Sequence, residues 1–457
     1  MKALKKISFL ALVLLIISAV DSNRNLPSAA IFGSSLIFFF IFSALLFLIP
    51  SSLVSAELSA AFPQTGGIYH WVRLAFGKNM GLLAIWFQWI QTVAWYPPIL
   101  SFIAGTAAYF FDPSLIENKT YMIFAIAGIF WALTIFNLLG LYISAKLNSL
   151  FVIIGTILPM LFLAVLGLHW ILKGDPLAVS FTAKAIFPHL KTWDAWTALV
   201  ATMGSLQGVE LAGVHINSIH KPQTTYPRAI LIAGTYILLS MILGSLAIAI
   251  VIPLKQINLA GGIMQVFFAF FQTFHLEKLS MLMAFLIVSG SIGALINWII
   301  SPTKGLLNAA EYGSLPPYFT KLNRNRVASR ILITQAIIVT LLCAVLLLVP
   351  SVNAFYWFFT ALSVSLYMCM YILMFCAALK LRSMHSGKTF QVPLGRIGLV
   401  FCCLLGIVGS GLTIFFGFVP PPGVNVGSNF RYILMIVTGT IVFISPVFYM
   451  MVRKRSV

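Results

Sequence analysis

The chain has 457 residues, of which 61% are hydrophobic and 8% are charged, and its net charge at pH 7 is +19. This composition lies far outside the range of soluble proteins and is typical of a polytopic membrane protein. The basic residues stand in short segments between apolar runs, so the charge does not indicate nucleic-acid binding. The five cysteines lie in apolar segments, which predicts no disulfide framework, and we expect neither a metal site nor a cofactor.

Apolar runs of about 20 residues or more predict an all-α integral membrane protein with about twelve spanning helices. The first run continues through charged residues into more apolar chain, so we expect a retained first helix rather than a cleaved signal. The segment 260–275, AGGIMQVFFAFFQTFH, is too short to span and should lie at the surface or pack on the bundle. The helices are predicted at 7–33, 34–58, 80–111, 120–139, 148–172, 195–217, 227–252, 279–301, 331–349, 354–378, 397–419 and 431–451.

These helices are expected to form one polytopic domain over residues 1–457. Helices one to five would occupy about 7–172, helices six to ten about 195–378, and the last two about 397–451. With the N-terminus inside, the inner segments carry 20 of the 28 Lys and Arg residues and the outer segments carry 7. Because cytoplasmic loops are enriched in Lys and Arg, this distribution predicts that both termini are cytoplasmic.

Charged residues interrupt two of the predicted helices in mid-membrane: Asp21 and Arg24 in the first, and Glu210 in the sixth. An ionised group at the bilayer centre costs roughly 3 kcal/mol or more, so such residues usually face a cavity or a partner. The stretch from Ser18 to Pro27 is a poor helix former, because Asp, Asn and Ser compete for backbone bonds and Pro27 lacks a donor. The sixth helix breaks similarly at the glycine-flanked segment 204–210. A broken first and sixth helix predict a five-plus-five inverted repeat with two helices added.

The two breaks have the right chemistry for an α-amino acid. The N-termini of half-helices offer free N–H groups and a positive dipole end to a carboxylate, and free carbonyls accept hydrogen bonds from an ammonium. Two interpretations of Asp21 and Arg24 stay open: a mutual ion pair at i, i+3 spacing, or a role lining the pathway as gate or substrate contact. Glu210 could act in gating or proton coupling, or it could be a buried structural acid.

Two motifs resemble those of a known transporter family. Residues 63–71, PQTGGIYHW, are similar to the P-x-x-GG-x-Y-x-W signature of the amino acid–polyamine–organocation (APC) superfamily permeases. Residues 252–267 follow the pattern IPxxxINLxxGxMQxF and resemble the bacterial glutamate:γ-aminobutyrate antiporters. The segment 208–210 followed by Tyr226-Pro227, and the run from Trp298 through Pro302 to Gly305, resemble them too. The similarity is collinear over nearly the whole chain.

The resemblance implies a LeuT-like fold and amino-acid transport by alternating access, as an antiporter, in the bacterial cytoplasmic (inner) membrane. The two breaks would cradle the α-carboxylate and the α-amine of the substrate. Glu210 would be the acid of the inner gate, and Trp95 and Tyr96 would be aromatic lids or walls, although packing explains such aromatics equally well. The substrate-binding residues implied by position are Ser18, Ala19, Asp21, Ser22, Asn23, Arg24, Ser205, Leu206, Gln207, Gly208 and Trp298.

The resemblance leaves the substrate open, because the first break carries charges where the family usually has small, uncharged residues. Arg24 would favour a second carboxylate, as in glutamate, Asp21 would favour a basic amine, and a pair between them would favour neither. The antiporters also carry a long C-terminal tail that plugs the inner mouth, whereas this chain stops at Val457. We therefore do not expect that form of pH gating.

The expected partners are small amino acids and the lipid bilayer, and the sequence predicts no oligomeric state. Proton-coupled symport and a membrane nutrient sensor that binds without transport are the alternatives to exchange. The sequence contains no HExxH, GxSxG or nucleotide-binding motif, so we expect neither an enzyme nor a pump driven by ATP hydrolysis.

Overall fold

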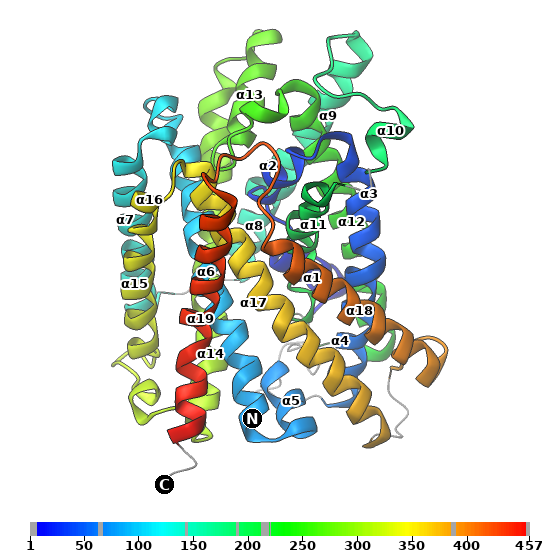
Figure 1. The fold of residues 1–457 in the computed structure, drawn as a ribbon, viewed down its shortest axis with the longest axis vertical. Helices are drawn as coiled ribbons and strands as arrows, with labels where there is room; N and C mark the ends of the chain where they lie inside the picture. Colours follow the sequence, from blue (N-terminus) through cyan, green and yellow to red (C-terminus); the bar gives the residue numbers. More distant parts are fainter. Residues whose placement is uncertain are drawn as a thin grey trace.

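The computed structural model describes residues 7–62, 67–141, 145–188, 192–211, 219, 221–384 and 390–453. Within these ranges the regular structure is helical, apart from one isolated bridge between Ile7 and Ile219. Long helices stand side by side in a bundle, and the marked N- and C-termini lie at the same, lower end (Figure 1). The prediction of an all-α membrane protein is confirmed.

Nine helices among the described residues are long and apolar enough to cross a membrane. They correspond to predicted helices two, four, five and seven to twelve. Their spans are Gly33–Ala61, Lys119–Leu138 (α7), Ser149–Lys173, Thr224–Val251, Leu279–Glu311 (α14), Ser329–Leu348, Val352–Met384, Gly395–Gly417 (α18) and Asn429–Val452. Some of these spans comprise several elements: α3 (Leu36–Ser43) and α4 (Ile49–Ala61); α8 (Ala145–Val152) and α9 (Leu158–Lys173); and α15 (Ser329–Cys343) and α16 (Val345–Leu348). The remaining spans contain α12 (Pro222–Val251), α17 (Val352–Leu381) and α19 (Asn429–Arg453).

The third predicted helix is the 31-residue α6 (Lys78–Ala108), which is long enough to span but is not apolar enough to be among these nine. Nearly all its side chains are buried, including Gln88, Gln91 and Thr92, because it packs between α17, α14, α7 and the short α5 (Ile68–Phe76). A helix enclosed by protein does not need apolar side chains to face lipid, which explains its lower hydropathy.

The first and sixth helices are broken, as the sequence predicts. The first consists of α1 (Phe9–Val20) and α2 (Asn25–Ala30), with Asp21 to Arg24 between them. The sixth begins with a 3-10 turn at Trp193–Thr197, continues as α11 (Ala198–Leu206) and then breaks. Its predicted continuation to residue 217 falls largely outside the described residues.

Several predicted boundaries are wrong by a few residues, and the largest error has a clear cause. The eighth helix was expected to end at residue 301 before Pro302, but α14 continues through this proline to Glu311. Proline removes the hydrogen bond to the carbonyl four residues back, which is that of Trp298. The Tyr96 hydroxyl donates to that carbonyl at 3.2 Å and so replaces the lost bond. The short segment after helix seven forms α13 (Gly262–Thr273), which packs on the bundle with Phe267 and Phe270 fully buried.

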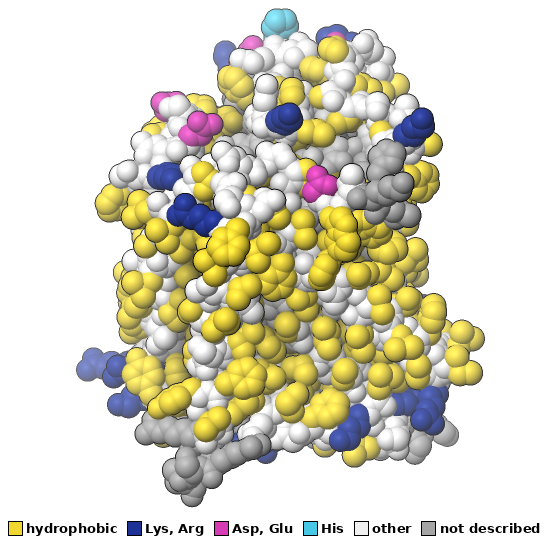
Figure 2. Space-filling view, viewed as in Figure 1, with side chains coloured by type: hydrophobic (Ala, Val, Ile, Leu, Met, Phe, Trp, Pro, Cys, Tyr) yellow, Lys and Arg dark blue, Asp and Glu magenta, His cyan; other side chains and the backbone are white. Residues whose placement is uncertain are grey.

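Hydrophobic side chains form a broad belt around the middle of the molecule (Figure 2). On the face shown, Asp and Glu occur with Lys and Arg at the upper end, whereas Lys and Arg gather without them at the lower end. Exposed Leu, Ile, Val and Phe side chains contribute to the belt, as on α9 and α18. Such an apolar belt between two polar ends is the surface expected of a protein embedded in a bilayer.

Candidate substrate site

The two helix breaks meet in the middle of the bundle. The amide of Asp21 donates to the carbonyl of Ile17 at 2.7 Å, which ends α1, and α2 begins four residues later. After α11, Gln207 is extended and Gly208 has φ +108°, a conformation that favours glycine. A Cβ on Gly208 would lie 3.1 Å from the carbonyl oxygen of Ala19, so the sixth-helix break packs closely on the backbone of the last turn of α1.

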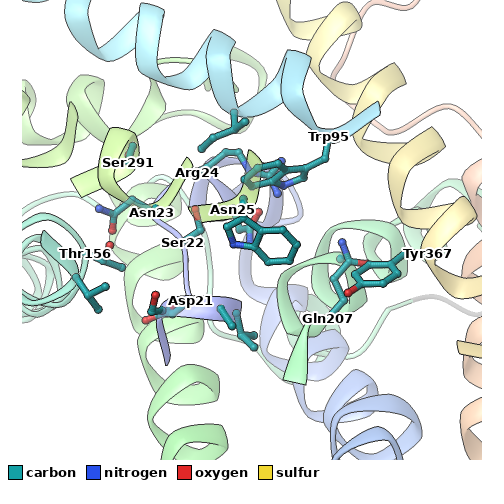
Figure 3. Close-up of a pocket in the computed structure, with 18 of the residues that line it drawn as sticks. Asp21, Ser22, Asn23, Arg24, Asn25, Trp95, Thr156, Gln207, Ser291 and Tyr367 are labelled. Carbon is teal, nitrogen blue, oxygen red and sulfur yellow. The ribbon is translucent and has the colours of Figure 1, made fainter. Parts of the chain in front are cut away.

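A small cavity of about 50 Å³ lies beside these breaks (Figure 3). It is lined by nine of the fourteen residues that the sequence analysis predicts for substrate binding, gating or proton coupling. These are Ser18, Ala19, Asp21, Ser22, Asn23, Arg24, Trp95, Gln207 and Trp298. The other lining residues are Val20, Asn25, Gln91, Ile99, Val152, Thr156, Gly204, Ser291, Ala294 and Tyr367.

Arg24 is a buried cation that faces the cavity without an ionic partner among the described residues. Its side chain is 4% exposed, and its guanidinium carbon lies 5.2 Å from the ring centroid of Trp95. Its Nε is buried and has no hydrogen-bond partner, while its backbone carbonyl accepts from the hydroxyl of Tyr356 at 2.7 Å. A cation placed in this way can bind a carboxylate that enters the cavity.

Asp21 lies on the other side of the break from Arg24 (Figure 3). Its carboxylate accepts from the hydroxyl of Ser240 on α12, at 3.2 and 3.4 Å from its two oxygens. The alternative of an ion pair between Asp21 and Arg24 is therefore not found. An i, i+3 pair needs a continuous helix, and unwinding between these residues turns their side chains apart.

Two amide oxygens in the cavity have no hydrogen-bond partner although they are buried: Oδ1 of Asn23 and Oε1 of Gln207. The Nδ2 of Asn23 donates to the carbonyl of Gly155 at 2.8 Å, which fixes the orientation of this amide. The Gly155 carbonyl is free because the residue four positions on is Pro159, which has no N–H. The chain forms a π-helical turn there, at Ile153–Ile157. Both unpartnered oxygens can accept hydrogen bonds from an ammonium group.

Aromatic side chains close one side of the cavity. The rings of Trp95 and Trp298 lie 5.5 Å apart between centroids, and both line the cavity. Tyr96 is fully buried outside the lining, where its ring packs on Phe130 and its hydroxyl holds the Trp298 carbonyl. The structure thus places Tyr96 behind the aromatic wall rather than in it.

Glu210 lies just beyond the cavity, 3% exposed. Its two carboxylate oxygens accept hydrogen bonds from the hydroxyls of Tyr367 and Tyr371 on α17. The hydroxyl of Tyr371 also accepts from the amide of Gly208 at 2.7 Å. Because Tyr367 lines the cavity, one side chain connects the cavity to this buried acid.

The other predicted residues of the sixth helix serve the fold rather than the cavity. The Ser205 hydroxyl donates to the Ala201 carbonyl within α11 at 2.7 Å, and Leu206 is fully buried in the core. Sequence reasoning missed Gln91, Thr156, Ser291 and Tyr367, all of which line the cavity. A polar residue within an apolar run was the available signal. No group of three His, Cys, Asp or Glu side chains suited to a metal ion occurs in the described part of the chain.

Comparisons with known proteins agree with this architecture. Residues 7–443 match the family model described as amino acid permease. An uncharacterised transporter of Legionella pneumophila is 37% identical over 96% of this chain and 95% of its own length. A glutamate/γ-aminobutyrate antiporter of Lactococcus lactis is 29% identical over 94% of this chain and 88% of its own length.

A solved manganese transporter from Eremococcus coleocola has the same fold, with a TM-score of 0.60 at 13% identity. The alignment covers 96% of this chain and 94% of that one. At this identity the likeness concerns the fold alone, and it confirms the expected LeuT-like architecture with broken first and sixth helices.

Proposed function

The chain belongs to the amino acid permease family of the APC superfamily and is an integral membrane protein, and on this premise we propose that it exchanges amino acids by alternating access. The relatives are transporters, and one of them is an antiporter, which supports exchange. The observation that carries the proposal is the cavity between the two helix breaks, with an unpaired buried cation on its wall.

The polar atoms of this cavity fit the two charged groups of an amino acid. The substrate carboxylate binds the guanidinium of Arg24, which otherwise lacks an ionic partner among the described residues. The substrate ammonium donates to the unpartnered oxygens of Asn23 and Gln207. The backbone of Ser18 to Ser22, which runs from the last turn of α1 into the break, contributes the remaining hydrogen bonds. A cation on the wall favours substrates with a carboxylate over diamines, which would place two positive charges beside it.

The cavity has two candidate barriers. Trp95 and Trp298 form an aromatic wall on one side, and Glu210 with its two tyrosines joins the sixth-helix break to α17 on the other. Opening toward the inner side would separate α11 from α17 and break the hydrogen bonds of Glu210. We propose Glu210 as the acid of the inner gate on this basis. The excess of Lys and Arg in the inner segments supports a cytoplasmic location for the end of the molecule on the Glu210 side and for both termini.

Uptake of a labelled amino-acid panel into proteoliposomes tests the proposal. We expect uptake of carboxylate-bearing amino acids only when unlabelled substrate is loaded inside. Uptake without internal substrate, driven by a proton gradient, would show a symporter. No uptake under either condition would contradict transport and favour a nutrient sensor.

Proton-coupled symport is the second candidate, and one observation favours it. Glu210 is a buried acid with no ion pair among the described residues, and intramembrane acids of this kind serve as proton carriers in transporters. Glu210→Gln keeps the shape of the side chain and removes its proton site. If Glu210 carries the coupled proton, the variant should lose the pH dependence of uptake in vesicles while retaining a wild-type melting temperature. An unchanged pH profile would exclude this role.

A further inference from the structure

A second pocket, remote from the substrate site, lies at the lower end of the molecule between α17 and α18. It has a volume of about 370 Å³ and is lined by the last turn of one helix and the first turns of the other. Three of its side chains are basic: Lys380, Arg382 and Arg396. Lys and Arg side chains gather at this end of the two helices (Figure 2).

One of the three cations is neutralised and fixed in place. The guanidinium of Arg382 forms a salt bridge of 2.7 Å with Glu57 on α4 and donates to Gln391 at 2.8 Å. The second carboxylate oxygen of Glu57 accepts from the amide of Val392 at 2.7 Å, which ties the loop before α18 to the same acid. These bonds give the pocket a rigid wall.

The other two cations remain without a counter-ion. Lys380 and Arg396 are exposed, and neither forms an ion pair with a described carboxylate. Lys380 lines the pocket, and its ammonium lies 5.0 Å from the ring centroid of Phe76 on α5. The pocket therefore has an uncompensated charge of about +2 and should attract an anion.

The pocket lies at the end of a lipid-facing surface. From its first turn onward, α18 exposes Ile397 (78%), Phe401 (62%), Leu404 (54%) and Val408 (53%). Their spacing of three and four residues places them along one face of the helix. A ligand that fills the pocket with an anionic group can therefore also cover this apolar face with hydrocarbon.

We propose that this pocket binds the phosphate of an anionic phospholipid whose acyl chains lie along the exposed face of α18. Lys380 and Arg396 provide the charge, and Arg382 forms the fixed wall. Ser383 also lines the pocket, and its hydroxyl donates to the carbonyl of Lys380 at 2.9 Å. A free phosphate would use the cations but would leave the apolar face uncovered. Anionic lipids are attracted by basic segments at a membrane surface by about 1 kcal/mol per Lys or Arg.

The test is lipid binding to the detergent-purified full chain, measured by native mass spectrometry during titration with phosphatidylglycerol. Lys380→Gln with Arg396→Gln removes both free charges, and we expect the affinity for phosphatidylglycerol to fall about 30-fold, as two such charges predict. Lys321→Gln with Arg324→Gln is the matched control, because both residues are exposed and lie outside the pocket. The exchanged pair Lys380→Arg with Arg396→Lys retains the charge and should retain most of the affinity.

Three results would overturn the proposal. The first is equal affinity of the double variant and the wild type, and the second is an equal loss in the matched control. The third is displacement of the bound anion by an excess of inorganic phosphate as effectively as by lipid, which would indicate a site for a soluble anion. Phosphatidylcholine, which has no net charge, should bind the wild type and the double variant with the same low affinity.

Discussion

Replacing Arg24 with methionine should stabilise the empty protein and weaken substrate binding at the same time. Arg24 is buried, faces the cavity and lacks an ionic partner among the described residues. Methionine retains much of the apolar stem and removes the charge. A residue that served only the fold would not produce these two opposite effects.

The structure allows both magnitudes to be worked out. An unpaired buried charge costs several kcal/mol, and stacking of the guanidinium on Trp95 offsets about 2 kcal/mol of that cost. Arg24→Met should therefore raise the free energy of unfolding of the substrate-free protein by about 1–3 kcal/mol. A hydrogen bond from this cation to a substrate carboxylate is worth about 1.5–3 kcal/mol. Its loss should weaken binding of a carboxylate-bearing amino acid by about 10- to 150-fold.

Thermal unfolding in detergent, with and without the substrate identified by the uptake panel, measures both effects on the same sample. The wild type should melt at a lower temperature than Arg24→Met when empty, and at a given substrate concentration the wild type should be stabilised more than the variant. Arg324→Met, at an exposed arginine outside the cavity, controls for loss of a positive charge. Exchange in proteoliposomes should show the corresponding increase in KM.

Both expectations are contradicted if Arg24→Met melts at a lower temperature than the wild type while binding the substrate with unchanged affinity. That result would mean that the cation stabilises the fold and does not contact the substrate. Arg24→Lys distinguishes charge from shape, because lysine retains the charge but cannot form the planar two-point contact of a guanidinium with a carboxylate. We expect an intermediate affinity for this variant.

Three further variants test contacts around the site and at the lower end. Tyr96→Phe removes the hydroxyl that donates to the Trp298 carbonyl of α14. Loss of this hydrogen bond costs about 1 kcal/mol and should slow exchange about fivefold, with the amount of folded protein unchanged. An exchange rate equal to that of the wild type would contradict a role for this hydrogen bond in positioning α14. Gly155→Ala places a Cβ 2.4 Å from the backbone of α14 and should lower the melting temperature, whereas Gly411→Ala, with nothing within 4 Å, should not; similar melting temperatures would contradict this close helix contact. Arg382→Met leaves the carboxylate of Glu57 buried without its partner and should cost about 3 kcal/mol in thermal or denaturant unfolding. A decrease in the free energy of unfolding smaller than the measurement error would mean that water reaches the carboxylate of Glu57.

Much of the architecture follows from the sequence, because bilayer thickness sets the length of each apolar run. The break in the first helix was predictable as well, since Asp21, Ser22, Asn23 and Pro27 all disfavour helix there. Pro302 misled the same reasoning, because its effect depends on a hydroxyl from another helix. A proline is more easily accommodated within a helix where another group satisfies the carbonyl that it frees.

The residues that line the cavity were harder to predict. Helices with apolar side chains on all faces show no amphipathic pattern, so the sequence does not indicate which face of α6 or α14 lies toward the cavity. Gln91 and Ser291 were missed for this reason, although both are polar residues in apolar surroundings. The opposite directions of Asp21 and Arg24 depend on the backbone angles within the break, which no residue pattern specifies.

The carbonyls of Gly155 and Trp298, which accept side-chain hydrogen bonds, imply that residues outside the cavity can change substrate selectivity. Each carbonyl is available because a proline stands four residues later, and each holds a side chain that shapes the site. Replacing Pro159 with alanine would restore an N–H that competes for the Gly155 carbonyl and would release the amide of Asn23 to reorient. A search for variants with altered substrate selectivity should therefore include Pro159 and Pro302, because their substitution leaves every residue that lines the cavity unchanged.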